Sequence, residues 1–214
     1  RRSCAGYTRS GFPASVILTL TVINPMNRLT SLTIRGYKTI KELHDFQPHQ
    51  INVLIGENAC GKSNFISFFR LLSYMSEGEL QDFVSRHGFA SAFLLDGGED
   101  VSRIEAELSF ETDQGLNEYA FDLTHAAADT LIFAEEKFRF SDHEFPEPAP
   151  WRSGETGHKE SLLVRQAEAG DGTARFIRGC LQLCIVHQFH NTSEKARIRQ
   201  AWHETDNRYL KEDG

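Results

Sequence analysis

The stretch from Gly56 to Ser63, GENACGKS, combines residue types in a spacing that suits phosphate binding. It has the order G-x-x-x-x-G-K-S, and its last three positions are Gly61, Lys62 and Ser63. In such a loop successive backbone N–H groups bind phosphate oxygens, and a glycine lets the phosphates approach closely. The Lys62 ammonium would reach the β- and γ-phosphates, and the Ser63 hydroxyl would be a ligand of Mg²⁺. The sequence therefore predicts a site for a nucleoside triphosphate and its magnesium ion.

The residues on either side of this loop predict the elements that must hold it. The apolar run INVLI, residues 51–55, is typical of a β-strand covered on both faces. After Lys62 apolar residues recur at helical spacing, and a second apolar side indicates a largely buried helix. The first set is Phe65, Phe68, Phe69 and Leu72, and the second is Ile66, Leu71 and Met75. Strand, glycine loop and helix follow in the order that phosphate binding requires.

The rest of the chain predicts an antiparallel sheet beside this unit. Residues 29–46 alternate and indicate two short strands. Three further alternating stretches, at 104–110, 119–123 and 132–140, predict a β-meander in which each strand has one solvent-exposed face. In the last stretch the apolar set is Ile132, Ala134, Phe138 and Phe140. The fold class is α/β, and antiparallel strands argue against an all-parallel enzyme such as a small-molecule kinase.

The remaining segments set the expected domain limits. Residues 1–25 include a faintly signal-like apolar stretch, but no cleavage pattern follows, so we expect a leader or upstream extension outside the fold. One domain would then cover 26–214. The Pro-rich, charged segment at about 142–160 is expected to be a mobile insertion. A short helix at 173–180 and an apolar strand at 181–189 would follow.

Composition limits the class of protein. The chain has 214 residues, of which 40% are hydrophobic and 25% charged, and no apolar run approaches a membrane span of about 18 residues. The net charge of −7 gives no chain-wide basic footprint for nucleic acid. The four cysteines show no paired spacing, which fits a reducing cytoplasm.

Several cysteines and histidines have positions or spacings that could suggest a redox or metal site, but none of them completes one. Cys60 lies inside the loop, where a small side chain leaves room for phosphates, and a structural role is favoured over redox regulation. Cys180 and Cys184 stand among apolar residues, as buried thiols commonly do. His187 and His190 have a metal-like spacing, but no cysteine or carboxylate cluster completes it.

Two stretches together resemble a known family. LTSLTIRGYKTIKEL, and after a gap INVLIGENACGKSNFISFFRLLSYM, are similar to the N-terminal part of ABC-type ATPase heads of the SMC/RecF/OLD class, in particular bacterial AAA-family ATPases related to RecF. In that family an aromatic-Lys/Arg-Ser/Thr step precedes the glycine loop, as Tyr37, Lys38 and Thr39 do here. HQFHNTSEKARIRQ and DNRYLKEDG are weaker matches to later segments, and the resemblance covers about 26–214.

The resemblance implies an ABC-type P-loop head with ATP and Mg²⁺ as cofactors. Such heads hydrolyse ATP when two of them close face to face, so a head-to-head homodimer is implied, and DNA as a partner would rest on the resemblance alone. The metal ligand would be Ser63. The residues implied to bind the nucleotide are Gly56, Glu57, Asn58, Ala59, Cys60, Gly61, Lys62, Ser63, Asn64, Lys38 and Thr39.

The family's remaining catalytic parts find no counterpart in this sequence. SAFLLDGGED, with Asp96 and Glu99, resembles a Walker B motif, but it comes too early and lacks an adjacent Asp-Glu pair. No Ser-Gly-Gly signature is present, and WRSGETG is not followed by a predicted helix. We therefore expect an N-terminal portion of a head, incomplete at its C-terminus, that binds Mg-ATP and is inactive alone, with no catalytic residue assigned.

Two other function classes stay open at this point. One is a nucleotide-binding interaction module that hydrolyses nothing. The other is a different P-loop enzyme, a GTPase or a kinase, although the chain has no N-K-x-D for guanine and no D-x-x-G after the loop.

Overall fold

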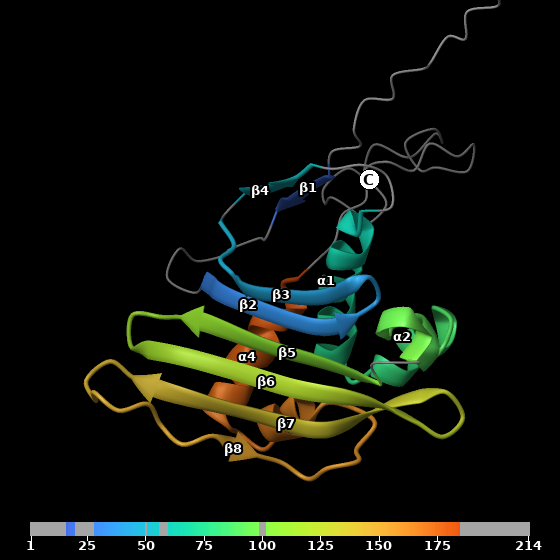
Figure 1. Cartoon of the computed structure of the whole chain (residues 1–214). Coiled ribbons are helices and arrows are strands. Elements are labelled where there is room, and N and C mark those ends of the chain that lie inside the picture. Colours follow the sequence, from blue (N-terminus) through green and yellow to red (C-terminus); the bar gives the residue numbers. More distant parts are fainter. Residues whose placement is uncertain (1–15, 20–27, 50, 56–59, 99–101, 185–214) are drawn as a thin grey trace, which may run out of the picture.

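A computed structural model of the chain describes residues 16–19, 28–49, 51–55, 60–98 and 102–184 (Figure 1). Its main part is an antiparallel six-stranded sheet with the strand order β3-β2-β5-β6-β7-β8. The strands are β2 (Arg28–Tyr37), β3 (Ile40–Phe46), β5 (Arg103–Glu111), β6 (Gly115–Ala126), β7 (Thr130–Asp142) and β8 (Arg152–Ser153). The two strands predicted at 29–46 and the antiparallel meander are thus confirmed.

In the part of the chain that the structure describes, four helices accompany the sheet, and Figure 1 shows α1 and α4 lying behind it. They are α1 (Lys62–Glu77), α2 (Leu80–Arg86), α3 (Leu162–Glu168) and α4 (Gly172–Gln182). Two short 3₁₀ turns, η1 (Ala90–Ala92) and η2 (Leu95–Gly98), connect α2 to the meander. The helix predicted after Lys62 is confirmed, and so is the one predicted at 173–180.

The core forms between these helices and the inner face of the sheet. Phenylalanines of α1 supply much of it, because their spacing places them on one side of the helix. Phe68 is fully buried, meets Tyr37 edge-on at 5.2 Å between ring centroids, and stacks on Phe121 of β6 at 6.4 Å. The buried residues that the helices contribute include Phe65, Phe68, Phe69, Leu72, Met75, Leu163, Ile177 and Leu181.

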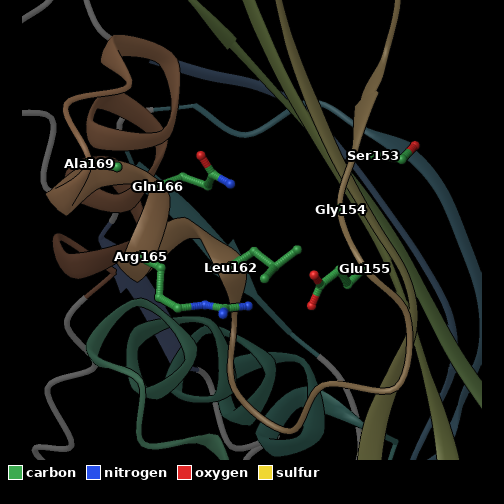
Figure 2. A pocket seen from close by; sticks show the side chains of 7 residues that line it. All are labelled: Ser153, Gly154, Glu155, Leu162, Arg165, Gln166 and Ala169. Carbon is green, nitrogen blue, oxygen red and sulfur yellow. The ribbon is translucent and has the colours of Figure 1, made fainter.

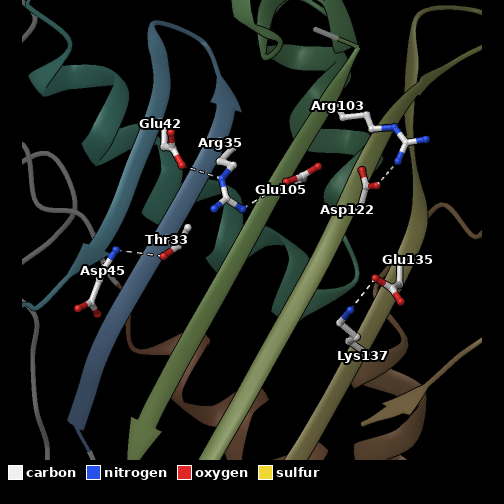
Figure 3. Close-up of polar contacts among 9 residues, drawn as sticks. All are labelled: Thr33, Arg35, Glu42, Asp45, Arg103, Glu105, Asp122, Glu135 and Lys137. Carbon is white, nitrogen blue, oxygen red and sulfur yellow. Dashed lines mark hydrogen bonds and ion pairs between the residues drawn. The ribbon is translucent and has the colours of Figure 1, made fainter.

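The outer face of the sheet is polar and carries pairs of opposite charge on neighbouring strands (Figure 3). Ion pairs of this kind join Arg35 to Glu42 at 3.0 Å and Arg103 to Asp122 at 2.8 Å. On β5 the buried side chains alternate with exposed ones, as the sequence predicts. A sheet with one wet face of this kind is a common antiparallel arrangement.

The predicted apolar face of β7 is correct for only part of the strand. Asp122 pairs with Glu135 but Leu123 pairs with Phe133, so β7 contains one extra residue, Ala134. This bulge reverses the alternation of inward and outward side chains. Leu131 and Phe133 are therefore the buried pair before it, and the expectation that Ile132 and Ala134 form the inner face is wrong.

The same bulge turns a carboxylate into the core. Glu136 stands opposite Phe121 and is 2% exposed. Its Oε1 accepts hydrogen bonds from the hydroxyls of Tyr119, at 2.7 Å, and Ser161, at 2.6 Å. Its Oε2 contacts Nε2 of His158 at 2.7 Å and accepts from the backbone N–H of Leu162 at 2.8 Å. Since Ser161 is also the N-cap of α3, these contacts fix α3 to the sheet; we call them the Glu136 junction.

A second, two-stranded sheet pairs β1 (Val16–Thr19) antiparallel with β4 (Ile51–Leu54). The predicted strand before the glycine loop is thus present. Within the described structure it is not covered on both faces, because Val53 is 54% and Ile55 69% exposed. β1 lies in the stretch assigned to a leader, and it pairs an edge of β4 that would otherwise lack a neighbour there. That the fold does without residues 1–25 stays a prediction.

The segment at 142–160 has defined contacts in the structure. β8 pairs with β7, and the ring of Trp151 lies over the Arg139 guanidinium at 4.4 Å. Arg139 also forms a bidentate ion pair with Glu118 and donates to the backbone oxygen of Ala149. The mobility of the segment stays a prediction. The strand expected at 181–189 begins inside α4, which ends at Gln182, and its part beyond 184 lies outside the described residues.

Candidate functional site

The glycine loop leads directly into α1. Gly56, Glu57, Asn58 and Ala59 lie outside the described residues, which resume at Cys60. Gly61 is the N-cap of α1 with φ 96° and ψ 0°, a left-handed conformation that favours glycine. A Cβ at Gly61 would also stand only 3.1 Å from Oγ1 of Thr39. Both the backbone angle and the close neighbour therefore explain a glycine at this position.

The start of α1 is suited to an anion. The first N–H groups of a helix have no intrahelical acceptor, and Gly61 offers no side-chain cap in their place. The first turn also contains no acidic residue that would oppose a phosphate. Because the helix dipole adds a partial positive charge here, the arrangement favours a negatively charged ligand.

The two chemical side chains of the loop are accessible. Ser63 is exposed, and Lys62 is partly exposed with its ammonium donating to Sγ of Cys60 at 3.4 Å. Cys60 is exposed and is a free thiol. Lys62 and Ser63 are thus placed where a ligand at the helix N-terminus could meet a cation and a hydroxyl.

The turn between β2 and β3 lies against this loop, but its two predicted site residues face different surroundings. Oγ1 of Thr39 accepts a hydrogen bond of 2.8 Å from Nδ2 of Asn64, in the first turn of α1. The Lys38 ammonium instead lies over the ring of Phe93, 4.9 Å from its centroid. Burial lowers the pKa of Lys38, and the charge of Arg70 lowers it further. Arg70 is six residues beyond Asn64, which is about 9 Å farther along α1. Lys38, near Arg70, therefore lies away from the loop, and Thr39 is the residue of the turn that lies beside the loop.

The segment SAFLLDGGED packs against the same turn. Leu94 forms a β-bridge with Tyr37, and the backbone oxygen of Phe93 accepts from the N–H of Lys38 at 2.8 Å. Asp96 is exposed in a left-handed conformation with φ 51°, and Glu99 lies outside the described residues. The apolar run therefore ends in a 3₁₀ turn and not at the end of a strand.

A surface pocket of about 520 Å³ lies elsewhere, between the end of β8 and α3 (Figure 2). Figure 2 shows Arg165 and Glu155 on its two sides. It is lined by Ser153, Gly154, Glu155, Leu162, Arg165, Gln166 and Ala169. None of these residues belongs to the loop or to the turn beside it, so this pocket is separate from the candidate phosphate site.

The part of the chain that the structure describes contains no group of three or more His, Cys, Asp or Glu residues that could hold a metal ion. His187 and His190 lie outside the described residues. Across the described ranges, no helix is long and apolar enough to cross a membrane.

Sequence reasoning did not single out Ser67 for this site. Its hydroxyl lies 2.8 Å from that of Tyr37 and donates to the backbone oxygen of Asn64 at 2.9 Å. The available signal was spacing, because Ser67 follows Asn64 by three residues and so shares its helix face.

Comparison with known families gives one match for this region. A family model described as "AAA domain, putative AbiEii toxin, Type IV TA system" matches residues 51–153. The match starts at the first residue of β4 and ends at the last residue of β8. It supports a P-loop ATPase domain of the AAA type with nucleotide-binding activity. No curated protein shows a significant match to the chain.

Proposed function

We propose that the chain binds Mg-ATP through the loop from Gly56 to Ser63. The observation that carries the proposal is the uncapped N-terminus of α1, which brings together Gly61, Lys62 and Ser63. Backbone N–H groups of the loop would bind phosphate oxygens, and Lys62 would neutralise charge at the β- and γ-phosphates. Ser63 would be the protein's hydroxyl ligand to Mg²⁺, and Thr39 would face the phosphates from the β2–β3 turn.

We further propose that the domain is part of an ABC-type head of the SMC/RecF/OLD class. The resemblance of the Tyr37–Thr39 step supports this, together with the position of Thr39 beside Gly61. In such a head ATP is hydrolysed between two copies that meet face to face. Free thiols at Cys60, Cys180 and Cys184 are compatible with the proposed cytoplasmic location.

The polypeptide by itself should bind ATP without turning it over. Hydrolysis needs charge neutralisation at the phosphates, a metal, and a group that orients the attacking water. The loop supplies the first two. Asp96 does not lie at the end of a strand, as a Walker B aspartate would, because it occupies an exposed 3₁₀ turn. This same feature favours the second candidate function, a nucleotide-binding interaction module without hydrolysis.

A titration with a fluorescent ATP analogue, with and without Mg²⁺, tests the binding proposal. Lys62→Ala removes charge-assisted hydrogen bonds of about 1.5–3 kcal/mol, so the dissociation constant should rise by about 10- to 150-fold. Lys41→Ala is the matched control, since Lys41 is an exposed lysine on β3. Equal affinities for wild type and Lys62→Ala would refute the proposal.

A phosphate-release assay separates the two candidate functions from an active enzyme. The purified chain should show no rate above that of Lys62→Ala. A steady rate in wild type that disappears in Lys62→Ala would show that the chain contains its own water-orienting group. Mutating Asp96 and Glu99 would then show whether either residue is that group.

A further inference from the structure

Hydrogen bonds join both ends of the Tyr37–Thr39 turn to the beginning of α1. The Tyr37 hydroxyl meets Oγ of Ser67 at 2.8 Å, and Ser67 donates to the backbone oxygen of Asn64 at 2.9 Å. The Asn64 side chain then donates to Oγ1 of Thr39 at 2.8 Å. The contacts run from Tyr37 through Ser67 and Asn64 to Thr39, and we call them the turn–helix bridge.

The direction of each hydrogen bond follows from the number of hydrogens. A serine hydroxyl has one hydrogen, and Ser67 gives its hydrogen to the Asn64 carbonyl. Tyr37 must therefore be the donor to Ser67. Burial raises the pKa of the Tyr37 phenol well above its ordinary value, so the donor keeps its hydrogen at neutral pH.

At the other end of the bridge Thr39 retains a hydrogen. Its oxygen accepts from Asn64, and so its own O–H remains a donor. The oxygen lies over Gly61, 3.1 Å from where a Cβ would be. A phosphate held by the loop is the negatively charged acceptor that such a hydroxyl would suit.

The backbone of the turn is strained, which suggests that its position matters. Lys38 has φ 50° at the first position of a two-residue hairpin loop, where glycine or asparagine is usual. The conformation is held by the Lys38 N–H bond to Phe93 and by packing of the fully buried Tyr37 against Phe68. Strain that the surroundings maintain is a recognised feature of functional sites.

We propose that Tyr37 and Ser67 are positioning residues of the nucleotide site, which act through Asn64 to hold the Thr39 hydroxyl over Gly61. The inference rests on the proposed function, because it concerns the same phosphate loop. It goes beyond that function by giving a role to two residues that touch no ligand. Their effect on nucleotide affinity should therefore depend on the Thr39 hydroxyl.

Titration of the full chain with a fluorescent ATP analogue and Mg²⁺ tests this dependence. Thr39→Val, which removes the hydroxyl at nearly constant size, should weaken binding about tenfold, and Thr39→Ser should restore it to within about twofold. Tyr37→Phe should weaken binding by about three- to tenfold. In the double variant Tyr37→Phe/Thr39→Val the affinity should equal that of Thr39→Val alone, because the bridge would have no hydroxyl left to position.

Tyr74→Phe is the matched control. Tyr74 is a half-buried tyrosine on α1, the helix that contains Ser67, and it lies outside the bridge. It should leave the affinity unchanged. Ser67→Ala provides a second test of the bridge that does not require Tyr37→Phe to fold. Alanine is favourable in a helix, so this variant should fold. It should weaken binding like Tyr37→Phe.

The outcomes separate this inference from the proposed function. If wild type binds and Lys62→Ala does not, the proposed function stands. In that case wild-type affinity in Ser67→Ala, or multiplicative effects in the double variant, would overturn the positioning role. If wild type itself fails to bind the analogue, the proposed function and the inference built on it both fall.

Discussion

Two polar regions of this molecule differ in how far they are buried. In the Glu136 junction a carboxylate that is 2% exposed has four hydrogen-bonding partners. At the start of α1 the Lys62 ammonium is partly exposed and Ser63 is open to solvent. Buried polar groups must be satisfied within the protein, whereas polar groups at the surface can also be reached by a ligand. We therefore expect the Glu136 junction to govern stability and the loop to govern binding.

The largest expected effect is on stability, at the junction. Glu136→Ala would leave the hydroxyls of Tyr119 and Ser161 without their buried acceptor, and removing one partner of such a network costs about 3–5 kcal/mol. The melting temperature should fall by about 6–20 °C, since 1 kcal/mol corresponds to about 2–4 °C at this size. A thermal melt followed by circular dichroism measures it.

Glu135→Ala is the control for that measurement. Glu135 is the neighbouring residue on the outer face, where its ion pair with Lys137 is exposed and should contribute no more than about 1 kcal/mol. Equal melting temperatures for the two variants would contradict the contrast between a buried and an exposed carboxylate.

The loop should show the reverse behaviour. Lys62→Ala should keep the melting temperature within about 2 °C of wild type, because Lys62 is a partly exposed surface residue and surface substitutions usually change stability by about 0.5 kcal/mol or less. With a saturating ATP analogue, however, wild type should melt at a higher temperature and the variant should not, since a ligand stabilises only the state that binds it. A large loss of stability in the ligand-free variant would mean that Lys62 also supports the fold.

Asp129 provides an intermediate case, because it is satisfied but more exposed than Glu136. Its carboxylate accepts from the backbone N–H and the hydroxyl of Ser91, both at 2.9 Å, and contacts His125. These bonds, first the one from the Ser91 N–H, lower the pKa of Asp129. A lowered folded-state pKa stabilises the fold above the unfolded-state value, about 3.9, and this contribution is lost as the pH falls through the folded-state value.

The expected result is a stability difference that depends on pH. Wild type should be more stable than Asp129→Asn at pH 6, and the difference should shrink as the pH is lowered from about 5 toward 2. Urea denaturation at several pH values measures the difference. A gap that stays constant over this range would mean that the Asp129 charge contributes nothing to the fold.

The smallest effect is expected from removing residues 1–25. The alternating pattern that opens the predicted domain begins after Met26, although β1 pairs with β4. The melting temperature of the truncated chain should change by less than about 4 °C, which corresponds to about 1 kcal/mol, and nucleotide affinity should be unchanged. A drop of many degrees would show that β1 is an integral strand, and that the strand before the loop needs it.

Local sequence patterns predict the elements whose signals lie within a short stretch of chain. The glycine-loop pattern specifies the start of α1, because backbone conformation and helix capping depend on neighbouring residues. Helical spacing of Phe65, Phe68 and Phe69 predicted the buried side of α1, and alternation predicted β5 with its wet face. These patterns are complete within about ten residues, so a reading along the chain finds them.

Features that join distant parts of the chain depend on tertiary contacts. The bulge at Ala134 depends on pairing between β6 and β7, and without it Glu136 would face solvent. The hydrogen bond between Thr39 and Asn64 spans 25 residues, and the one between Ser161 and Glu136 also spans 25. No local preference predicts such partners, because their proximity arises from packing of the sheet against α1 and α3. The glycine-loop pattern thus predicts which residues bind phosphate, and tertiary packing places Thr39 beside Asn64 and Gly61.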